Sequence, residues 1–426
     1  MKRGVHLKRQ FLIWLILLEF AYILSFIFLV HFGIGNENNN RNRRRMQSES
    51  SKQCEMIVTD KVPLPSKTFY ACEKEILFFD NMFAVLNNVT LRVSRSSNSK
   101  ENGSRFSMFY NSNHCQNRIN LEGLNLRNPV LSWIKKIQIS NNIYNNSIYS
   151  QGVGFLVSRH DLNNLYHTMT LIYNMVVAKF LLRITHSTTV VIFVDAYDEK
   201  TVLRELWDTL FQEIVHIKKV SNALHFRTLI MVNSGYEGYL SHFRLPRLPL
   251  VSEFTQFVAN KFEICNKREL NCSSINILII LRQDDRNQND SIKVIERKFY
   301  NEDRMLSEIK RSLPEHTVRG VRLESFPIKT QFSFIAKTDF LIGIHGAGMT
   351  YALFLPEHAG VLELFNANRD TGNLHYRTIS KWRNLFYRAW QNYRMKDEFP
   401  NFRTRFHART IKYYVMEYIR FKCKSI

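Results

Sequence analysis

The stretch from Thr338 to Phe365 constrains the fold of this chain most, because its pattern indicates a strand, a glycine turn, a helix and a second strand. Phe340 to Ile344 is a short apolar run typical of a buried parallel strand. Gly346 and Gly348 follow, where the backbone turns at positive φ or approaches a ligand closely. A helix starting at Met349 would direct its first N–H groups at the turn, which suits a phosphate. An ordinary β–α turn is the alternative interpretation.

Elsewhere in the chain, apolar runs that suit strands alternate with helical patterns. In the first half, strands are expected at 89–93, 130–134, 154–157, 189–194, 214–217 and 226–232, and helices at 166–180 and 205–211. In the second half, helices are expected at 252–263, 301–313 and 330–337, and strands at 275–281, 318–323, 340–344 and 360–365. This alternation predicts an α/β protein with parallel sheets and crossover connections. We therefore expect two Rossmann-like domains facing a cleft, over residues 66–255 and 256–426.

The N-terminal segment carries a membrane signature. Residues 11–31 are almost entirely apolar and long enough to span a bilayer, and basic residues precede them. A cleaved signal peptide would have a shorter apolar core and a small-residue cleavage site. We therefore expect a cytosolic tail at 1–10, a transmembrane signal anchor at 11–31 and a polar, flexible stem at 32–65.

Two further features indicate that the rest of the chain lies in an oxidising lumen. Asn-x-Ser/Thr sequons occur at Asn88, Asn102, Asn145, Asn271 and Asn289. The six cysteines, none in a zinc-like C-x-x-C, are Cys54, Cys72, Cys115, Cys265, Cys272 and Cys423. The expected disulfides are Cys72–Cys115 and Cys265–Cys272. Buried free thiols in a cytosolic enzyme are the alternative.

The net charge of +22 permits anionic partners of several kinds. No zinc-finger spacing and no RNA-recognition motif is present, so we expect no nucleic acid partner. The basic residues are spread along the chain, as on a solvated surface. A nucleotide diphosphate would need only a few of them.

In the second half, polar residues lie at or near the carboxyl ends of the expected strands, where open parallel sheets bind ligands. Arg282 ends the first strand and could hold a diphosphate through two hydrogen bonds. His345 and the glycines end the third. Glu363 lies in the fourth strand and could accept hydrogen bonds from ribose hydroxyls. The alternatives are a surface arginine after a strand and an edge-exposed glutamate.

In the first half, a polar loop from Arg159 meets the start of a helix near His167. The positive end of the helix dipole would lower the pKa of His167 and favour a neutral imidazole that can take a proton. Asp161 is the alternative base, and a purely structural histidine is the alternative interpretation. Asp195 ends a strand and resembles a sugar-nucleotide metal site only loosely. Since no Asp-x-Asp occurs in the chain, we expect no metal site of that kind.

Several of these motifs together resemble glycosyltransferase family 61. They are Asp339 to Phe365 with its His-Gly-Ala-Gly-Met-Thr core, Asn164 to Thr170, Phe193 to Asp195, Leu206 to Phe211, Phe226-Arg227, and Arg282 with Arg297 and Asn301-Glu302. They occur in the family's order between about residues 150 and 395. Within the family they are most similar to the core β-1,2-xylosyltransferases of N-glycans. Met349 and Tyr351 depart from the family pattern, which leaves the donor or acceptor specificity open.

The resemblance implies a GT-B fold, inverting transfer from a UDP-sugar donor without a cofactor or bound metal, and a single-pass type II Golgi membrane protein with a lumenal catalytic domain. The donor-binding residues that it implies are Arg282, Arg297, His345, Gly346, Ala347, Gly348 and Glu363. The implied acceptor-side residues are Asn164, Tyr166 and Asp195, and we add His167 or Asp161 as the catalytic base.

We therefore expect transfer of xylose from UDP-xylose to the core β-mannose of a glycoprotein N-glycan. One rival is transfer of GlcNAc to O-mannose or to a Ser/Thr of an EGF domain. A rival of another class is a non-catalytic lumenal glycan-binding protein that keeps the fold.

Overall fold

The computed structural model describes the parts of the chain that carry both sheets. These are residues 68–71, 76–79, 82–93, 106–110, 137–139, 147–184, 189–195, 197, 201–221, 223–233, 235–282, 285–286, 292–293, 297–367 and 372–423. All of them belong to one compact unit, residues 56–426. The expected tail, anchor and stem, and the expected strand at 130–134, lie outside the described residues. Within the described residues, no helix has the length and apolar character needed to cross a membrane.

The C-terminal half contains a five-stranded parallel sheet, which confirms the expected class of fold for this half. Its strands are β10 (Asn276–Ile280), β14 (Thr317–Val321), β15 (Phe340–Ile344), β16 (Gly360–Phe365) and β17 (Phe386–Gln391). Their spatial order is β14-β10-β15-β16-β17, with every neighbouring pair parallel. After β10 the chain forms β14 at one edge of the sheet. It then returns to the other side of β10, where β15, β16 and β17 follow in order toward the opposite edge. Such a reversal opens a crevice at the carboxyl ends of β10 and β15, where ligands bind.

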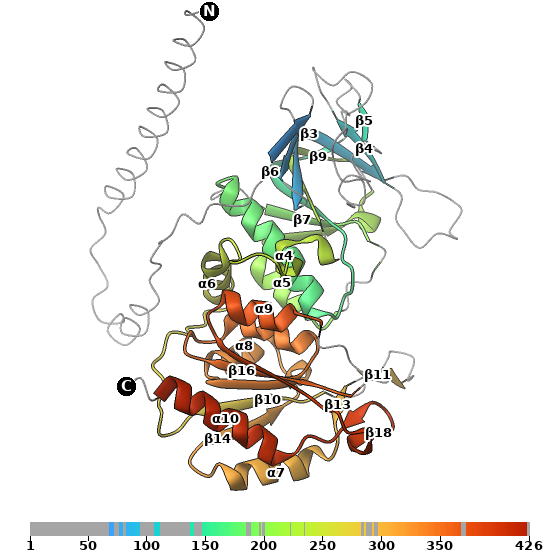
Figure 1. Ribbon diagram of the computed structural model, residues 1–426. Helices are drawn as coiled ribbons and strands as arrows, with labels where there is room; N and C mark the ends of the chain where they lie inside the picture. Colours follow the sequence, from blue (N-terminus) through green and yellow to red (C-terminus); the bar gives the residue numbers. More distant parts are fainter. Residues whose placement is uncertain are drawn as a thin grey trace, which may run out of the picture. The chain divides into compact units, whose positions relative to one another are not determined.

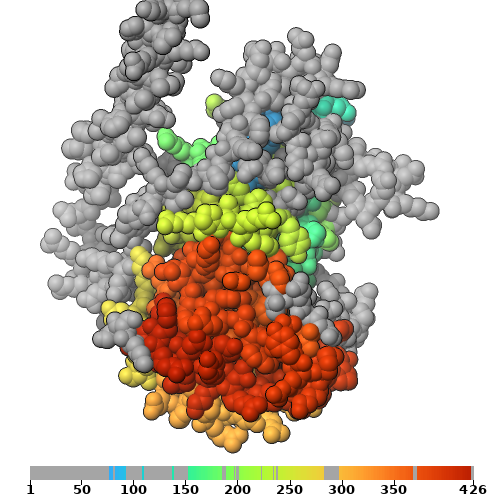
Figure 2. Space-filling model, in the orientation of Figure 1, coloured from blue at the N-terminus to red at the C-terminus, as the bar shows by residue number. Residues whose placement is uncertain are grey.

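Helices cover both faces of this sheet (Figure 1). On one face, α7 (Glu302–Ser312) and α10 (Ala408–Cys423) pack against Ile277, Ile279 and other strand residues. On the other face, α8 (Ile328–Ala336) and α9 (His375–Trp382) pack against Leu278 and Ile280. Because both faces are covered, β15 and β16 are buried along their whole length, which explains their unbroken apolar runs. In Figure 2 the residues of this half, coloured from orange to red, form a continuous surface.

The N-terminal half differs from the expected all-parallel sheet. Its main path is β1 (Thr68–Ala71), β2 (Ile76–Phe79), β3 (Phe83–Val93), β9 (Ala223–Val232), β6 (Ser147–Val157), β7 (Thr189–Phe193) and β8 (Glu213–His216). Two short strands, β4 (Phe106–Tyr110) and β5 (Ile137–Ile139), extend it from β3. The run β9-β6-β7-β8 and the short pair β4-β5 are parallel, whereas β1-β2, β2-β3, β3-β9 and β3-β4 pair antiparallel. The connection between β2 and β3 is too short for the crossover that parallel strands need. These two strands therefore pair antiparallel.

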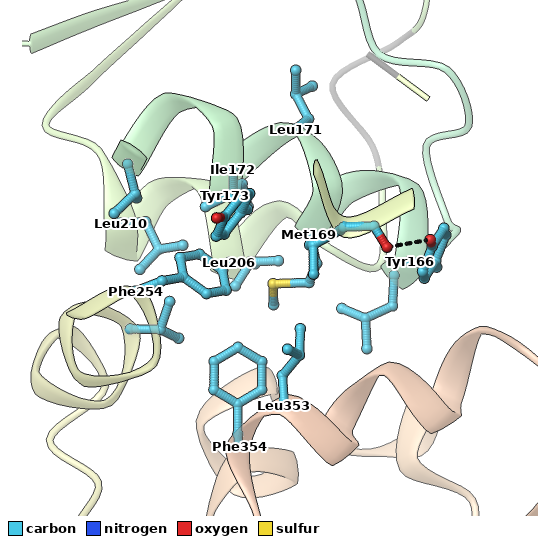
Figure 3. Packing of buried hydrophobic residues seen from close by; sticks show 14 of the residues in the cluster. Tyr166, Met169, Leu171, Ile172, Tyr173, Leu206, Leu210, Phe254, Leu353 and Phe354 are labelled. Atoms are coloured by element: carbon cyan, nitrogen blue, oxygen red, sulfur yellow. Dashed lines mark hydrogen bonds between the residues drawn. The ribbon is translucent and has the colours of Figure 1, made fainter. Parts of the chain in front are cut away.

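A long buried helix joins the two halves. Asn164 caps α4 (Leu165–Leu181) by accepting hydrogen bonds from the backbone N–H groups of Tyr166, at 3.0 Å, and His167, at 3.4 Å. This confirms the expected helix start. The helix is buried over most of its surface because it packs between the N-terminal sheet and the C-terminal half. Figure 3 shows Leu353 and Phe354 pointing toward this layer.

Two other helices complete the core of the N-terminal half. They are α5 (Arg204–Leu210) and α6 (Val251–Lys261), and both belong to the hydrophobic cluster that contains α4. The cluster continues without interruption into the C-terminal half, through Leu353 on one side and through α8 on the other. The two halves therefore share one core, and the position of α4 relative to the C-terminal sheet is set by apolar packing.

Two local expectations were wrong. The segment after the glycine turn is a 3-10 helix, η6 (Ala347–Phe354), and not an α-helix that begins at Met349. The cysteine pairing also differs: Cys272 bonds to Cys423 at the end of α10, and Cys265 is disulfide-bonded to another cysteine. Cys272 precedes β10, and the α10 helix lies along the same sheet face, so the two cysteines meet through tertiary packing. The expected Cys72–Cys115 bond lies outside the described residues.

Asp339 directly precedes β15 and is hydrogen-bonded to the first residues of β10 and β16. It is fully buried, and its carboxylate accepts hydrogen bonds from Arg268, from the Nε2 of His358 at 2.7 Å and from the backbone N–H of Asn276 at 2.7 Å. Its backbone carbonyl accepts from the N–H of Gly360 at 2.8 Å.

We expect the Asp339→Ala variant to lose about 3 to 5 kcal/mol of unfolding free energy, because the substitution leaves buried donors and a guanidinium without their acceptor. The measurement is chemical denaturation. The matched control is Asp208→Ala, which removes an exposed i,i+4 ion pair with Arg204. That variant should change by about 0.5 kcal/mol or less. Equal losses in the two variants would contradict the role assigned to Asp339.

Candidate functional site

A cavity of about 380 Å³ lies at the carboxyl ends of β10 and β15, within the size range of small-molecule sites. Both halves of the chain line it. Six predicted site residues meet here: Asp161, Asn164, Arg282, Gly346, Ala347 and Gly348. The structure thus brings together predicted acceptor-side and donor-side residues that are more than 100 positions apart in the sequence.

Arg282 crosses directly over the glycine turn. A Cβ atom added at Gly346 would lie 2.9 Å from the Nη1 atom of Arg282 and 3.3 Å from its Cζ atom. The φ of Gly346 is 170°, which is extended backbone. The expectation of positive φ at this glycine was therefore wrong. Glycine leaves room for the guanidinium, which a larger side chain at this position would displace. A positive charge beside the start of η6 is well placed for an anion.

His345, at the end of β15, is held by a buried carboxylate. Its Nδ1 atom is hydrogen-bonded to Oε1 of Glu363, and the hydroxyl of Tyr387 donates to Oε2 of the same carboxylate at 2.6 Å. Glu363 is fully buried in β16, and both of its oxygens are engaged by protein groups. The geometry therefore differs from the expected contact with ribose hydroxyls, and makes Glu363 the residue that orients His345.

Tyr387 was not identified from the sequence. It lies in β17, two residues before Ala389, which is the register partner of Glu363. Burial and the nearby carboxylate raise the pKa of its hydroxyl, so this group stays a hydrogen-bond donor. The signal in the sequence was weak, because a tyrosine in a strand usually serves packing.

His167 is 8% exposed, and within the described residues its Nδ1 atom has no hydrogen-bond partner. Burial is the main cause that lowers its pKa, and the charge of His160 lowers it further, while Asp161 acts in the opposite direction. The expected direction is thus confirmed, but the cause is desolvation rather than the helix dipole. A neutral imidazole whose ring nitrogen has no hydrogen-bond partner can accept a proton.

A series of neighbouring aromatic rings extends from His167 in the N-terminal half to His345 in the C-terminal half. The ring of His167 lies 4.7 Å from His160, 4.9 Å from Tyr236 and 5.7 Å from Tyr166, measured between centroids. Tyr166 lies 4.4 Å from His375, which lies 6.3 Å from His345.

Tyr376 also belongs to this cluster, with its ring centroid 5.2 Å from that of His345. It was not found from the sequence, and neither were Tyr236 and His375. Tyr236 follows β9, and the other two begin α9. Tyr236 is 58% exposed, so the cluster presents an aromatic face to solvent. Such a face suits the apolar side of a sugar ring.

The protein itself engages two predicted acceptor-side residues, Asp195 and Tyr166, and the predicted donor-binding residue Arg297 lies near Tyr376. Asp195 forms a buried, bidentate ion pair with Arg159, with contacts of 2.6 and 3.0 Å, and also accepts from its backbone N–H. Its carboxylate therefore joins the ends of β6 and β7 instead of facing an acceptor. Tyr166 is buried, and its hydroxyl donates to the carbonyl of Leu240. Arg297 has a φ of 65° and lies close enough to Tyr376 for its charge to affect the pKa of that hydroxyl, which burial raises.

Within the described residues, no group of three or more His, Cys, Asp or Glu side chains is arranged to hold a metal ion. The polar groups of the site are instead a guanidinium, backbone N–H groups, two imidazoles and a carboxylate. This set can hold an anionic group at the glycine turn and accept a proton at His167.

Comparisons with known proteins agree with this chemistry. The model of the family "Glycosyltransferase 61" matches residues 168–362. The chain is 25% identical over 264 residues to a beta-1,2-xylosyltransferase of Oryza sativa subsp. japonica, a match that covers 55% of this chain and 48% of that protein. It is 25% identical over 274 residues to a beta-1,2-xylosyltransferase of Arabidopsis thaliana, covering 55% and 50%. Over these matches the chain spans about half the length of those relatives.

A shorter match concerns a different activity. The chain is 35% identical over 95 residues to an EGF domain-specific O-linked N-acetylglucosamine transferase of Drosophila melanogaster. This match covers 22% of this chain and 18% of that protein.

We expect an NMR titration to give His167 a pKa below its usual value of about 6.5. The His160→Gln variant should raise this pKa, because a neighbouring positive charge is lost, and Asp161→Asn should lower it further. Both neighbours are exposed, so neither substitution should disturb the core. Shifts of the same sign in the two variants would contradict the electrostatic arrangement.

The Gly346→Ala variant should fold normally but weaken UDP binding, because the methyl group displaces the flexible guanidinium of Arg282. A double-mutant cycle tests this. Calorimetry should show that Gly346→Ala weakens binding by about tenfold in the wild-type background, equivalent to about 1.4 kcal/mol. In the Arg282→Ala background, the Gly346→Ala substitution should have little further effect on UDP binding. Additive losses would show that the glycine acts independently of Arg282.

Proposed function

We propose that the chain, whose residues 168–362 match the model of the family "Glycosyltransferase 61", is an inverting glycosyltransferase that transfers xylose from UDP-xylose to the core β-mannose of N-glycans. The observation that carries the proposal is the cavity at the carboxyl ends of β10 and β15, where Arg282 crosses the glycine turn. The two α/β halves lining this cavity support a GT-B arrangement.

In the proposed reaction, the acceptor hydroxyl oxygen attacks the anomeric carbon while the bond from that carbon to the diphosphate oxygen breaks. UDP leaves with the bonding electron pair, and the hydroxyl proton passes to a base. Arg282 and the N–H groups of the glycine turn stabilise the charge that develops on the diphosphate. In this proposal no cofactor or bound metal supplies that stabilisation.

His167 is the proposed base. Its imidazole is held neutral by burial, and its Nδ1 atom has no hydrogen-bond partner among the described residues. It lies in the first turn of α4, three residues after Asn164, which lines the cavity. Asp161 also lines the cavity and is the alternative base. The exposed ring of Tyr236 beside His167 supports binding of the acceptor sugar on this side.

The choice of xylose rests on the relatives named beta-1,2-xylosyltransferase, which match the longer part of the chain. The shorter match favours the rival, transfer of GlcNAc to O-mannose or an EGF-domain Ser/Thr. Tyr351, which departs from the family pattern, lines the cavity and donates a 2.6 Å hydrogen bond to Gln331, another lining residue. This pair is therefore placed to influence which donor fits.

We place the protein in the Golgi membrane as a single-pass type II protein with a lumenal catalytic domain. The apolar segment at 11–31 and the sequons motivate this proposal. The disulfide between Cys272 and Cys423 supports an oxidising compartment, and no cysteine among the described residues is free. Protease protection of a tagged protein in intact vesicles tests the topology.

A side-by-side assay tests the donor. Full-length protein is given UDP-xylose, UDP-GlcNAc or UDP-arabinose with an N-glycan acceptor and with an EGF-domain acceptor. We expect transfer from UDP-xylose to the N-glycan only. Transfer from UDP-GlcNAc to the polypeptide would replace the xylose proposal with its rival. If calorimetry detects no UDP binding, the non-catalytic alternative is favoured.

In the same assay, Arg282→Ala should lower kcat/KM by about a hundredfold or more, as loss of a charge-stabilising donor does. The melting temperature should not change, because Arg282 lies at the cavity rather than in the core. The matched control is Arg304→Ala on the exposed side of α7, which should keep full activity. Normal activity of Arg282→Ala would remove this residue from the diphosphate site.

A further inference from the structure

A second hollow lies beside the candidate site, at the edge of the C-terminal sheet. It has a volume of about 370 Å³ and is formed by the edge strand β17, the end of β16 and the residues before α9. The proposed reaction does not use it. The described residues that line it carry aromatic rings, amides and guanidinium groups, and no carboxylate is among them.

The most exposed aromatic side chain among the described residues lies here. Tyr393 is 83% exposed, although tyrosine side chains in folded proteins usually bury most of their ring. Trp390 in β17 lines the same hollow, and its ring rests against Phe406, with centroids 5.6 Å apart. Asn373 on the opposite wall adds an amide. Exposed rings beside planar hydrogen-bonding groups match a sugar, which has both apolar faces and hydroxyls.

The charges at this hollow favour a neutral ligand over an anionic one. Arg388 is held by Glu417 of α10, with contacts of 2.5 and 2.8 Å, so its charge is balanced within the protein. Arg377 is the other lining guanidinium, and it is exposed. A single exposed guanidinium gives little affinity for a phosphate or an acidic peptide.

Both walls of the hollow connect to the candidate site. On one side, the hydroxyl of Tyr387 donates to Glu363, which holds His345. On the other side, Asn373 accepts a hydrogen bond from the backbone N–H of His375, which is part of the ring cluster around Tyr166 and Tyr236. The lining of the hollow is therefore linked to the ring cluster through direct side-chain contacts.

We propose that this hollow is a second carbohydrate subsite, which binds neutral sugar residues of an oligosaccharide acceptor beyond the sugar that is modified. The proposal rests on the proposed glycosyltransferase function and extends it to acceptor size. It makes the enzyme selective for branched or long acceptors over short ones, and Tyr393 supplies the stacking surface.

The test compares two acceptors with purified full-length protein: a biantennary N-glycan, and the trisaccharide of its core with one β-mannose on two N-acetylglucosamines. In the Tyr393→Ala variant, KM for the biantennary glycan should rise about tenfold, the usual scale for losing one well-stacked ring. The KM for the trisaccharide, the KM for the donor and kcat should stay unchanged. The matched control is Tyr413→Ala, since Tyr413 is 58% exposed on α10 and does not line the hollow.

An equal rise in KM for both acceptors, or no rise for either, would overturn the subsite. A second measurement separates this failure from failure of the proposed function. Saturation-transfer NMR with the biantennary glycan, without donor, should show contact in the wild type and in Arg282→Ala, and weaker contact in Tyr393→Ala. Glycan contact without transfer from any donor would refute the enzymatic proposal and keep the subsite. Absence of contact in the wild type would refute the subsite.

Discussion

The buried carboxylate of Glu363 is the constraint on which the candidate site depends. A charge in a central strand is costly unless protein groups satisfy it, and here Nδ1 of His345 and the hydroxyl of Tyr387 do so. This arrangement fixes the ring orientation of His345 at the end of β15. The glycine turn begins at the next residue, so the position of the turn relative to the sheet follows from the same contacts. Removing the carboxylate would therefore disturb the turn as well as the histidine.

A second constraint acts across the two halves. Both halves contribute to one hydrophobic core, with α4 in its middle. Polar contacts add to it: Glu205 of α5 accepts hydrogen bonds from the backbone N–H groups of Ile328, at 2.6 Å, and Lys329, at 3.1 Å, at the start of α8. A carboxylate at a helix N-terminus is favourable both as a cap and for the helix dipole. These contacts set the spacing between Asn164 and the glycine turn, and so the width of the cavity.

The parts that could be predicted from the sequence are those with a local physical signature. The strands β15 and β16 are continuous apolar runs because both of their faces are covered, and Asn164 is a strong cap before an apolar helix. Arg282 and the glycine turn were expected to bind a ligand because they follow strands directly, and ligands bind at the carboxyl ends of strands in parallel sheets. Each of these expectations needs only a short window of sequence.

The features that were missed depend on contacts between distant segments. Tyr387 reaches Glu363 only because β17 pairs with β16 in one register, and Cys423 reaches Cys272 only because α10 packs along the sheet. Tyr236 and His375 come from different halves and meet, with centroids 5.9 Å apart, only when the shared core has formed. The cause of the lowered pKa of His167 was missed for the same reason. The pKa is lowered mainly by the burial of the imidazole, which comes from tertiary packing and not from the place of His167 in the helix. The residues proposed to bind the diphosphate therefore have local signals in the sequence, whereas the ring cluster proposed to bind the acceptor is a product of the whole fold.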